Sequence, residues 1–128
     1  MKGKHFVIEV QPFEAVVSIV INTTMKKAIK YAKKYNNSTL LYEKSDDNAG
    51  GLFCTSKENN YFIFLKYNST VHDIVHECFH AVMKTATDRG NKFSHKGEEF
   101  YAYSLGQLTE NVMDFFYGIE EVRKHNTR

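Results

Sequence analysis

The stretch from Val71 to Val82 contains the pattern His76-Glu77-x-x-His80, and this pattern constrains the fold more than any other part of the sequence. Residues four apart lie on one face of a helix, so a helix here would bring both imidazoles to one ion. The adjacent glutamate would lie near that ion, where it can take a proton from a metal-bound water. The pattern therefore predicts a metal-binding helix with His76 and His80 as ligands and Glu77 as general base.

The residues around the pattern favour a helix. Thr70 and Asp73 resemble a capping box at its start, and the run from Asp88 to Asn91 should end it. Apolar residues recur between them at spacings of three and four, which predicts a stripe that faces the core. This stripe consists of Val71, Ile74, Val75, Cys78, Phe79 and Val82. The alternative interpretation is a core helix that merely carries two half-buried histidines.

A catalytic zinc ion usually takes three protein ligands and leaves one position for water. Two candidates for the third ligand are histidines. His72 lies one turn before His76, but three ligands from one straight helix surround an ion poorly. We therefore expect His72 to be solvated or to lie outside the set of residues that bind the ion directly. His95 lies in the loop after the helix and would have to reach back.

The other two candidates, Glu98 and Glu99, open a second predicted helix, where the helix dipole favours acids. Ala102 and Gly106 lie one and two turns on from Glu99. Small side chains there would let the two helices approach closely and would bring a carboxylate to the ion. We expect one of the two glutamates to bind metal and the other to face water.

The remaining segments predict an α+β fold in one domain, residues 1–128. Runs at 6–10, 15–21, 39–42, 51–55 and 61–67 are β-rich, although 15–21 could instead begin a helix. Met25, Ala28, Ile29, Ala32 and Tyr35 are spaced for the apolar face of a helix that starts at Thr23 or Thr24 and has lysines opposite.

The last two β-rich runs, separated by a turn at 57–60, should form a hairpin that leads into the metal helix. The second long helix has the apolar stripe Tyr101, Leu105, Leu108, Val112, Phe115 and Ile119, and residues 120–128 should form its end or a frayed tail. We therefore expect a small, mainly antiparallel sheet packed on the metal helix and on the glutamate-bearing helix.

Composition narrows the function classes. The formal charge of +2 is too small to argue for nucleic acid by itself. Neither a signal peptide nor a membrane span is expected, and a cytoplasmic location follows. The two cysteines, Cys54 and Cys78, lack the paired spacing of a zinc ribbon. Cys78 should be a small core residue, and a disulfide between the two has no support in the sequence.

The motif, followed after eighteen residues by Glu99-x-x-Ala102, resembles the gluzincin branch of the zincin metallopeptidases. Residues 60–108 also look like small uncharacterised H-E-x-x-H proteins encoded by phages and mobile elements. The resemblance implies one Zn²⁺ per chain, bound by His76, His80 and Glu99. It also implies that the strand 61–67 is the edge strand that lines the cleft and pairs with an extended substrate.

These features lead us to expect a zinc-dependent metallopeptidase that hydrolyses peptide bonds in a peptide or protein substrate. One alternative is an inactive zincin-like module that holds metal and contacts a partner, in a phage regulatory or virion-associated role. A second alternative is a nucleic-acid-associated protease. An open, water-bearing metal position would favour the enzyme, and a fourth protein ligand such as His95 or His72 would favour a structural site.

Overall fold

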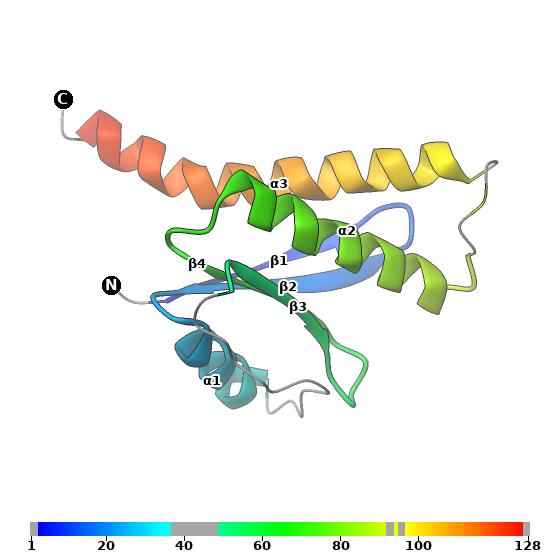
Figure 1. Cartoon of the computed structure of the whole chain (residues 1–128), viewed down its shortest axis with the longest axis horizontal. Helices are drawn as coiled ribbons and strands as arrows, with labels where there is room; N and C mark the ends of the chain where they lie inside the picture. Colours follow the sequence, from blue (N-terminus) through cyan, green and yellow to red (C-terminus); the bar gives the residue numbers. More distant parts are fainter. Residues whose placement is uncertain (1–2, 37–48, 92–93, 95–96, 127–128) are drawn as a thin grey trace.

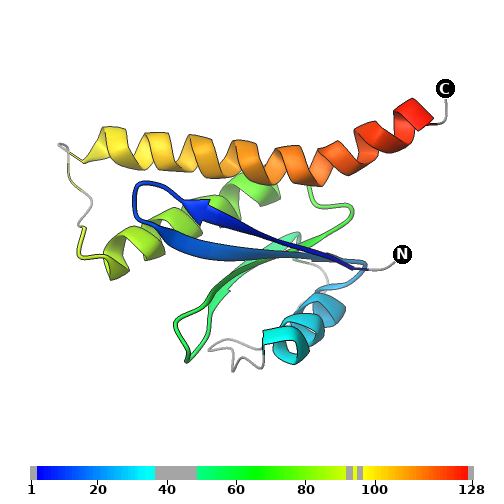
Figure 2. The same ribbon diagram turned by 180° about the vertical axis from the view of Figure 1, so that it is seen from behind.

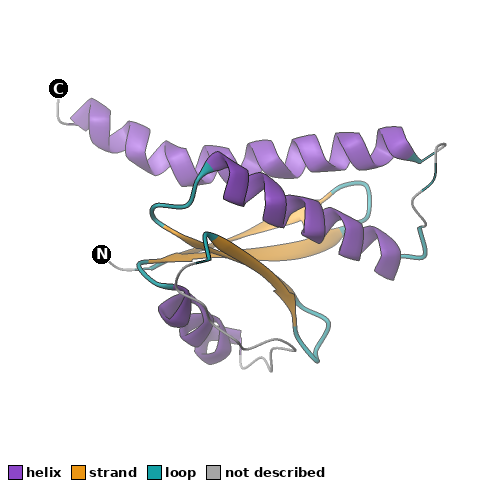
Figure 3. Cartoon of the chain, in the orientation of Figure 1, coloured by secondary structure: helices purple, strands orange, loops and turns teal. Residues whose placement is uncertain are grey.

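The computed structural model describes residues 3–36, 49–91, 94 and 97–126, without the side chains of residues 35–36 and 119–126. Within these residues the chain forms strands and helices in an α+β arrangement, as predicted (Figure 3). The elements, in chain order, are β1 (Lys4–Val10), β2 (Ala15–Asn22), α1 (Met25–Asn36), β3 (Gly51–Thr55), β4 (Tyr61–Lys66), α2 (Val71–Asp88) and α3 (Glu98–Asn126).

The strands form one mixed sheet in the order β1-β2-β4-β3. Two of the three pairings are antiparallel, and β2 pairs with β4 in parallel. The run 15–21, left open between strand and helix, is therefore a strand. The β3–β4 hairpin is confirmed, with Asn59 in the left-handed conformation (φ 62°) in its turn. The predicted strand at 39–42 lies outside the described residues.

The hairpin strands occupy the opposite positions from those that the resemblance implied. β4 is a central strand and β3 is the edge strand. Every residue of β4 from Tyr61 to Leu65 is buried. A continuous apolar run is typical of a strand that is covered on both faces, so the expectation of an edge strand at 61–67 was wrong.

Helices cover both faces of the sheet. α1 packs on one face, and α2 and α3 lie side by side on the other (Figures 1 and 2). The side chains of β4 alternate between two cores: Phe62 and Phe64 point toward α1, and Ile63 and Leu65 point toward α2 and α3. This alternation follows from the two-residue period of a strand.

The predicted apolar face of α1 is confirmed for Met25, Ala28, Ile29 and Ala32, which are buried; the side chain of Tyr35 lies outside the described part. The two cysteines are free. Cys54 belongs to the core beneath α1 and Cys78 to the core beneath α2, so the sheet separates them.

α3 begins at Glu98, as predicted, but runs through Gly118 to Asn126. Its buried residues, Tyr101, Ser104, Leu108, Val112 and Phe116, face the sheet and α2. Ser104 donates a hydrogen bond to the Gln11 carbonyl (2.6 Å), which fastens α3 to the β1–β2 turn. In the described part of the chain, no helix has a stretch long and apolar enough to cross a bilayer.

Candidate metal centre

α2 forms as the sequence predicts. The Asp73 N–H donates to Thr70 Oγ1 (3.2 Å), and the Thr70 N–H donates to Asp73 Oδ2 (2.8 Å), which completes the capping box. The helix ends at Asp88, and Gly90 follows in the left-handed conformation (φ 83°) that glycine adopts without strain. The motif therefore lies on an uninterrupted helix.

The buried face of α2 differs in part from the predicted stripe. Ile74, Cys78 and Val82 are buried, but Val71, Val75 and Phe79 are 51%, 37% and 48% exposed. The buried set is completed by Glu77, Ala81, Thr85 and Ala86. The helix is thus rotated so that the row 71-75-79 lies at the boundary with α3 and solvent, and Glu77 takes a place in the buried face.

The two motif histidines are exposed, and their Nε2 atoms lie 3.2 Å apart. Two nitrogens bound to one tetrahedral zinc at its usual bond length are about 3.3 Å apart. The same separation allows one ring to donate a hydrogen bond to the other when a single Nε2 is protonated. The separation of the two Nε2 atoms therefore suits one shared ion.

Glu77 lies between the histidine pair and the sheet, and it is only 7% exposed. Its Oε1 accepts a hydrogen bond from the backbone N–H of Phe53 in β3 (2.8 Å), and its Oε2 lies 3.9 Å from His76 Nε2. Burial raises the pKa of this carboxyl above its ordinary value, against the opposing effects of His76 and of the Phe53 N–H. One carboxylate oxygen thus faces the histidines while the other is held by the edge strand.

The close approach of β3 to α2 depends on two glycines. A Cβ on Gly51 would lie 2.8 Å from Glu77 Cγ, and a Cβ on Gly50 would overlap the Asp73 carboxylate. The predicted strand 51–55 begins with Gly51, and glycine at the start of a strand is a signal for close backbone contact. The sequence therefore contained a site feature that pattern reading missed.

Among the described residues, one group of histidine, cysteine, aspartate or glutamate side chains could hold a metal ion: His76, Glu77 and His80, with ligand atoms within 4.8 Å of one another. Burial raises the pKa of both cysteine thiols to about 12, which disfavours a thiolate ligand from Cys54 or Cys78.

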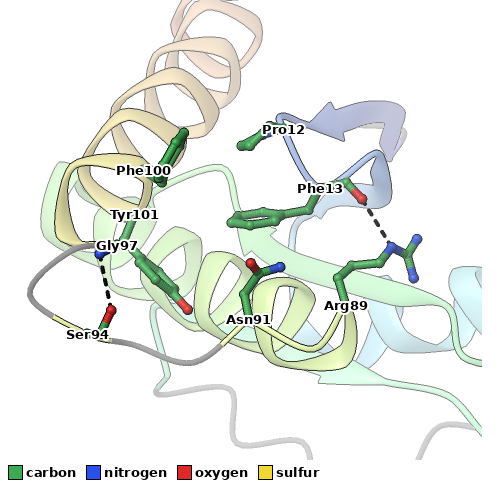
Figure 4. Close-up of a pocket in the computed structure, with 8 residues that line it drawn as sticks. All are labelled: Pro12, Phe13, Arg89, Asn91, Ser94, Gly97, Phe100 and Tyr101. Carbon is green, nitrogen blue, oxygen red and sulfur yellow. Dashed lines mark hydrogen bonds between the residues drawn. The ribbon is translucent and has the colours of Figure 1, made fainter.

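The structure does not bring Glu99 into this group. The first turn of α3 lies beside Arg89 and Asn91, just past the end of α2, around a hollow of about 610 Å³ (Figure 4). α2 ends eight residues beyond His80, or about 12 Å farther along the helix axis. Glu99 is exposed and lies beside Pro12, on the β1–β2 turn.

The close approach of α3 that we expected through Ala102 and Gly106 does not occur. Both residues are exposed, and a Cβ on Gly106 would meet no atom within 4 Å. α3 instead contributes Leu105 to the lining of the hollow beside the histidines. Glu98 lies two turns before Leu105 on the same side of the helix, about 10 Å along the axis, and is outside the group as well.

The remaining candidates, His72 and His95, differ in what the structure says of them. His95 lies outside the described residues. His72 is exposed one turn before His76, with ring centroids 6.1 Å apart. It lines a hollow of about 620 Å³ with both motif histidines and with Val75, Phe79 and Leu105. The apolar side of the candidate centre therefore faces α3, and its carboxylate side faces β3.

Comparisons of the chain with protein-family models, with curated proteins and with solved structures find no match. The residues of the site itself therefore carry the information about function.

Proposed function

We propose that this protein is a metal-dependent hydrolase that cleaves peptide bonds, with His76 and His80 as zinc ligands and Glu77 as the general base. The observation that carries the proposal is the convergence of two exposed imidazole nitrogens, 3.2 Å apart, beside a buried carboxylate oxygen 3.9 Å from one of them. When bound, the ion supplies Lewis acidity, which acidifies water and polarises a carbonyl oxygen.

The residues of the chain would then divide the work. Glu77 Oε2 would accept the proton of the attacking water and deliver it to the leaving amine. The hollow beside the histidines, on the side opposite Glu77, leaves space for one substrate side chain.

The edge strand supports a peptide as the substrate class. In the described part of the chain, no strand pairs with the outer edge of β3. Such an edge offers backbone donors and acceptors to an extended peptide. The contact between β3 and Glu77 places that edge next to the proposed base.

The test compares the zinc-loaded wild type with Glu77→Gln on a fluorogenic peptide library, with Glu110→Gln as the matched control. Glu110 is an exposed glutamate on α3, outside the metal group. We expect Glu77→Gln to keep zinc and to lose at least about a hundredfold in hydrolysis, and Glu110→Gln to match the wild type. Hydrolysis retained by pure Glu77→Gln protein would refute the role of Glu77.

The second candidate is a metal-binding interaction module without hydrolase activity, as the sequence also allowed. The observation that favours it is the incomplete ligand set: among the described residues, α3 presents Leu105 rather than a ligand to the histidine pair. Zinc binding without hydrolysis of any peptide in the library would support this candidate.

A further inference from the structure

The backbone N–H and C=O groups of alternate β3 residues point toward the edge that faces away from β4. In an antiparallel pair, every second residue exchanges backbone hydrogen bonds with the partner strand, and the backbone N–H and C=O groups of the residues between them point away from that strand. The Phe53 N–H donates to Glu77 Oε1 and not to β4. Phe53 therefore belongs to the outward set, and Gly51 and Thr55, two positions away on either side, belong to it as well.

An extended peptide that pairs with this edge needs the same donor. Pairing would place a carbonyl oxygen of the peptide at the Phe53 N–H, where Glu77 Oε1 now lies. One N–H cannot donate a full hydrogen bond to both oxygens. The Glu77 side chain also packs closely against the strand, because a Cβ added to Gly51 would lie only 2.8 Å from Glu77 Cγ.

We propose that the Phe53–Glu77 hydrogen bond restrains the carboxylate in the free protein, and that an extended peptide releases it by taking over the Phe53 N–H. The inference rests on the proposed function, since it concerns the general base of that site. Release gives Glu77 a second free oxygen on the side of the histidines. The base would thus become fully available only when a peptide lies along β3, and short substrates that do not reach the strand would be cleaved slowly.

The restraint can be observed without hydrolysis, by NMR on zinc-free protein with the capped hexapeptide acetyl-(Val-Lys)3-amide as the probe. The signals are the backbone amide of Phe53 and the ¹³C-labelled carboxylate of Glu77, which is assigned with Glu77→Gln. We expect saturating peptide to shift both signals together with the amides of Gly51 and Thr55. Shifts at Gly51 and Thr55 with Phe53 and Glu77 unchanged would overturn the proposal, and so would a peptide that leaves all four unchanged.

A pair of variants isolates the donor in the zinc-loaded protein. Phe53→Ala keeps the N–H and loses the ring, and Phe53→Pro loses both; proline is tolerated where an edge-strand N–H points outward. Relative to Phe53→Ala, we expect Phe53→Pro to raise kcat/KM about tenfold for an acylated dipeptide amide and to lower it for the hexapeptide. A purely structural role would lower both values, and that result would overturn the proposal.

Thr55→Pro is the matched control, because it removes an outward N–H that does not bind Glu77. It should weaken the hexapeptide without activating the dipeptide. If the zinc-loaded wild type cleaves neither substrate, the proposed hydrolase fails while the NMR result still decides the exchange of the hydrogen bond. If Glu77→Gln abolishes cleavage but the peptide leaves the Phe53 signal in place, the hydrolase stands and the restraint fails.

Discussion

Replacement of Gly51 by alanine tests the contact between the edge strand and the proposed base. The added Cβ would lie 2.8 Å from Glu77 Cγ and 3.4 Å from Leu65 Cδ2. The favourable separation of two non-bonded carbon atoms is about 3.5–4.0 Å, so Glu77 Cγ must move away by roughly 0.7 Å. A retreat of that size would lengthen the 2.8 Å hydrogen bond from Phe53 beyond its useful range.

The expected cost follows from two opposing terms. Overpacking of this kind costs about 1–3 kcal/mol, and the smaller backbone freedom of alanine in the unfolded chain returns about 0.5–1 kcal/mol. We therefore expect Gly51→Ala to lower the free energy of unfolding by about 1–2 kcal/mol. Gly106→Ala is the matched control: its Cβ meets nothing within 4 Å, so it should stabilise the helix by about 0.5–1 kcal/mol.

A double-mutant cycle assigns the cost to Glu77. Glu77→Ala removes the Cγ atom, so Gly51→Ala should become close to neutral in that background. The assay is urea unfolding in the presence of a chelator, because bound metal would add stability to the native state. An equal cost of Gly51→Ala in both backgrounds would refute the proposed contact, since the strain would then lie elsewhere in β3.

Two further predictions concern the C-terminal end of α2 and the side of the histidine pair that faces α3. The Tyr61 hydroxyl donates a hydrogen bond to Asp88 Oδ2 (2.6 Å). Burial alone would raise the Asp88 pKa, but this hydrogen bond and the nearby Lys84 have the larger combined effect, so the pKa is lowered. Stability from a lowered carboxyl pKa is present above about pH 4, the unfolded value, and is lost as the pH falls through the folded value. Tyr61→Phe should therefore cost about 1 kcal/mol at pH 7 and less at pH 2.5 in urea unfolding; an equal cost at both pH values would contradict this. Beside the histidine pair, Leu105→His should tighten zinc binding on the order of tenfold by adding a nitrogen ligand, whereas Leu105→Phe should not. Competition with a chelating dye measures both affinities, and equal zinc affinities of the two variants would contradict the placement of Leu105 beside the histidines.

Local chemistry made α2 and the hairpin predictable. The capping box at Thr70, the unbroken helical period and the histidine spacing all act within a few residues of one another. The turn near Asn59 and the β-rich runs beside it act over similarly short distances. These features position His76 and His80, so this part of the candidate site followed from the sequence.

Features that depend on contacts between distant segments did not follow from the sequence. The parallel pairing of β2 with β4, which makes β4 central, joins segments about forty residues apart and has no local signal. The exposure of Val75 and Phe79 depends on how α2 is rotated against the sheet and α3. Glu99 matched a motif spacing, but spacing does not determine which face of α3 turns toward α2.

The most direct test of the account is zinc stoichiometry by native mass spectrometry on tag-free protein. The wild type should bind one zinc per chain, and His80→Ala should lose it. His72→Ala and Glu99→Ala are the matched variants and should keep it, because neither residue belongs to the converging group. A loss in Glu99→Ala would contradict the placement of α3 and support the ligand set that the gluzincin resemblance implies. A wild type that binds no zinc from excess metal, or a His80→Ala variant that binds it equally well, would contradict the central claim that the histidine pair is a metal centre.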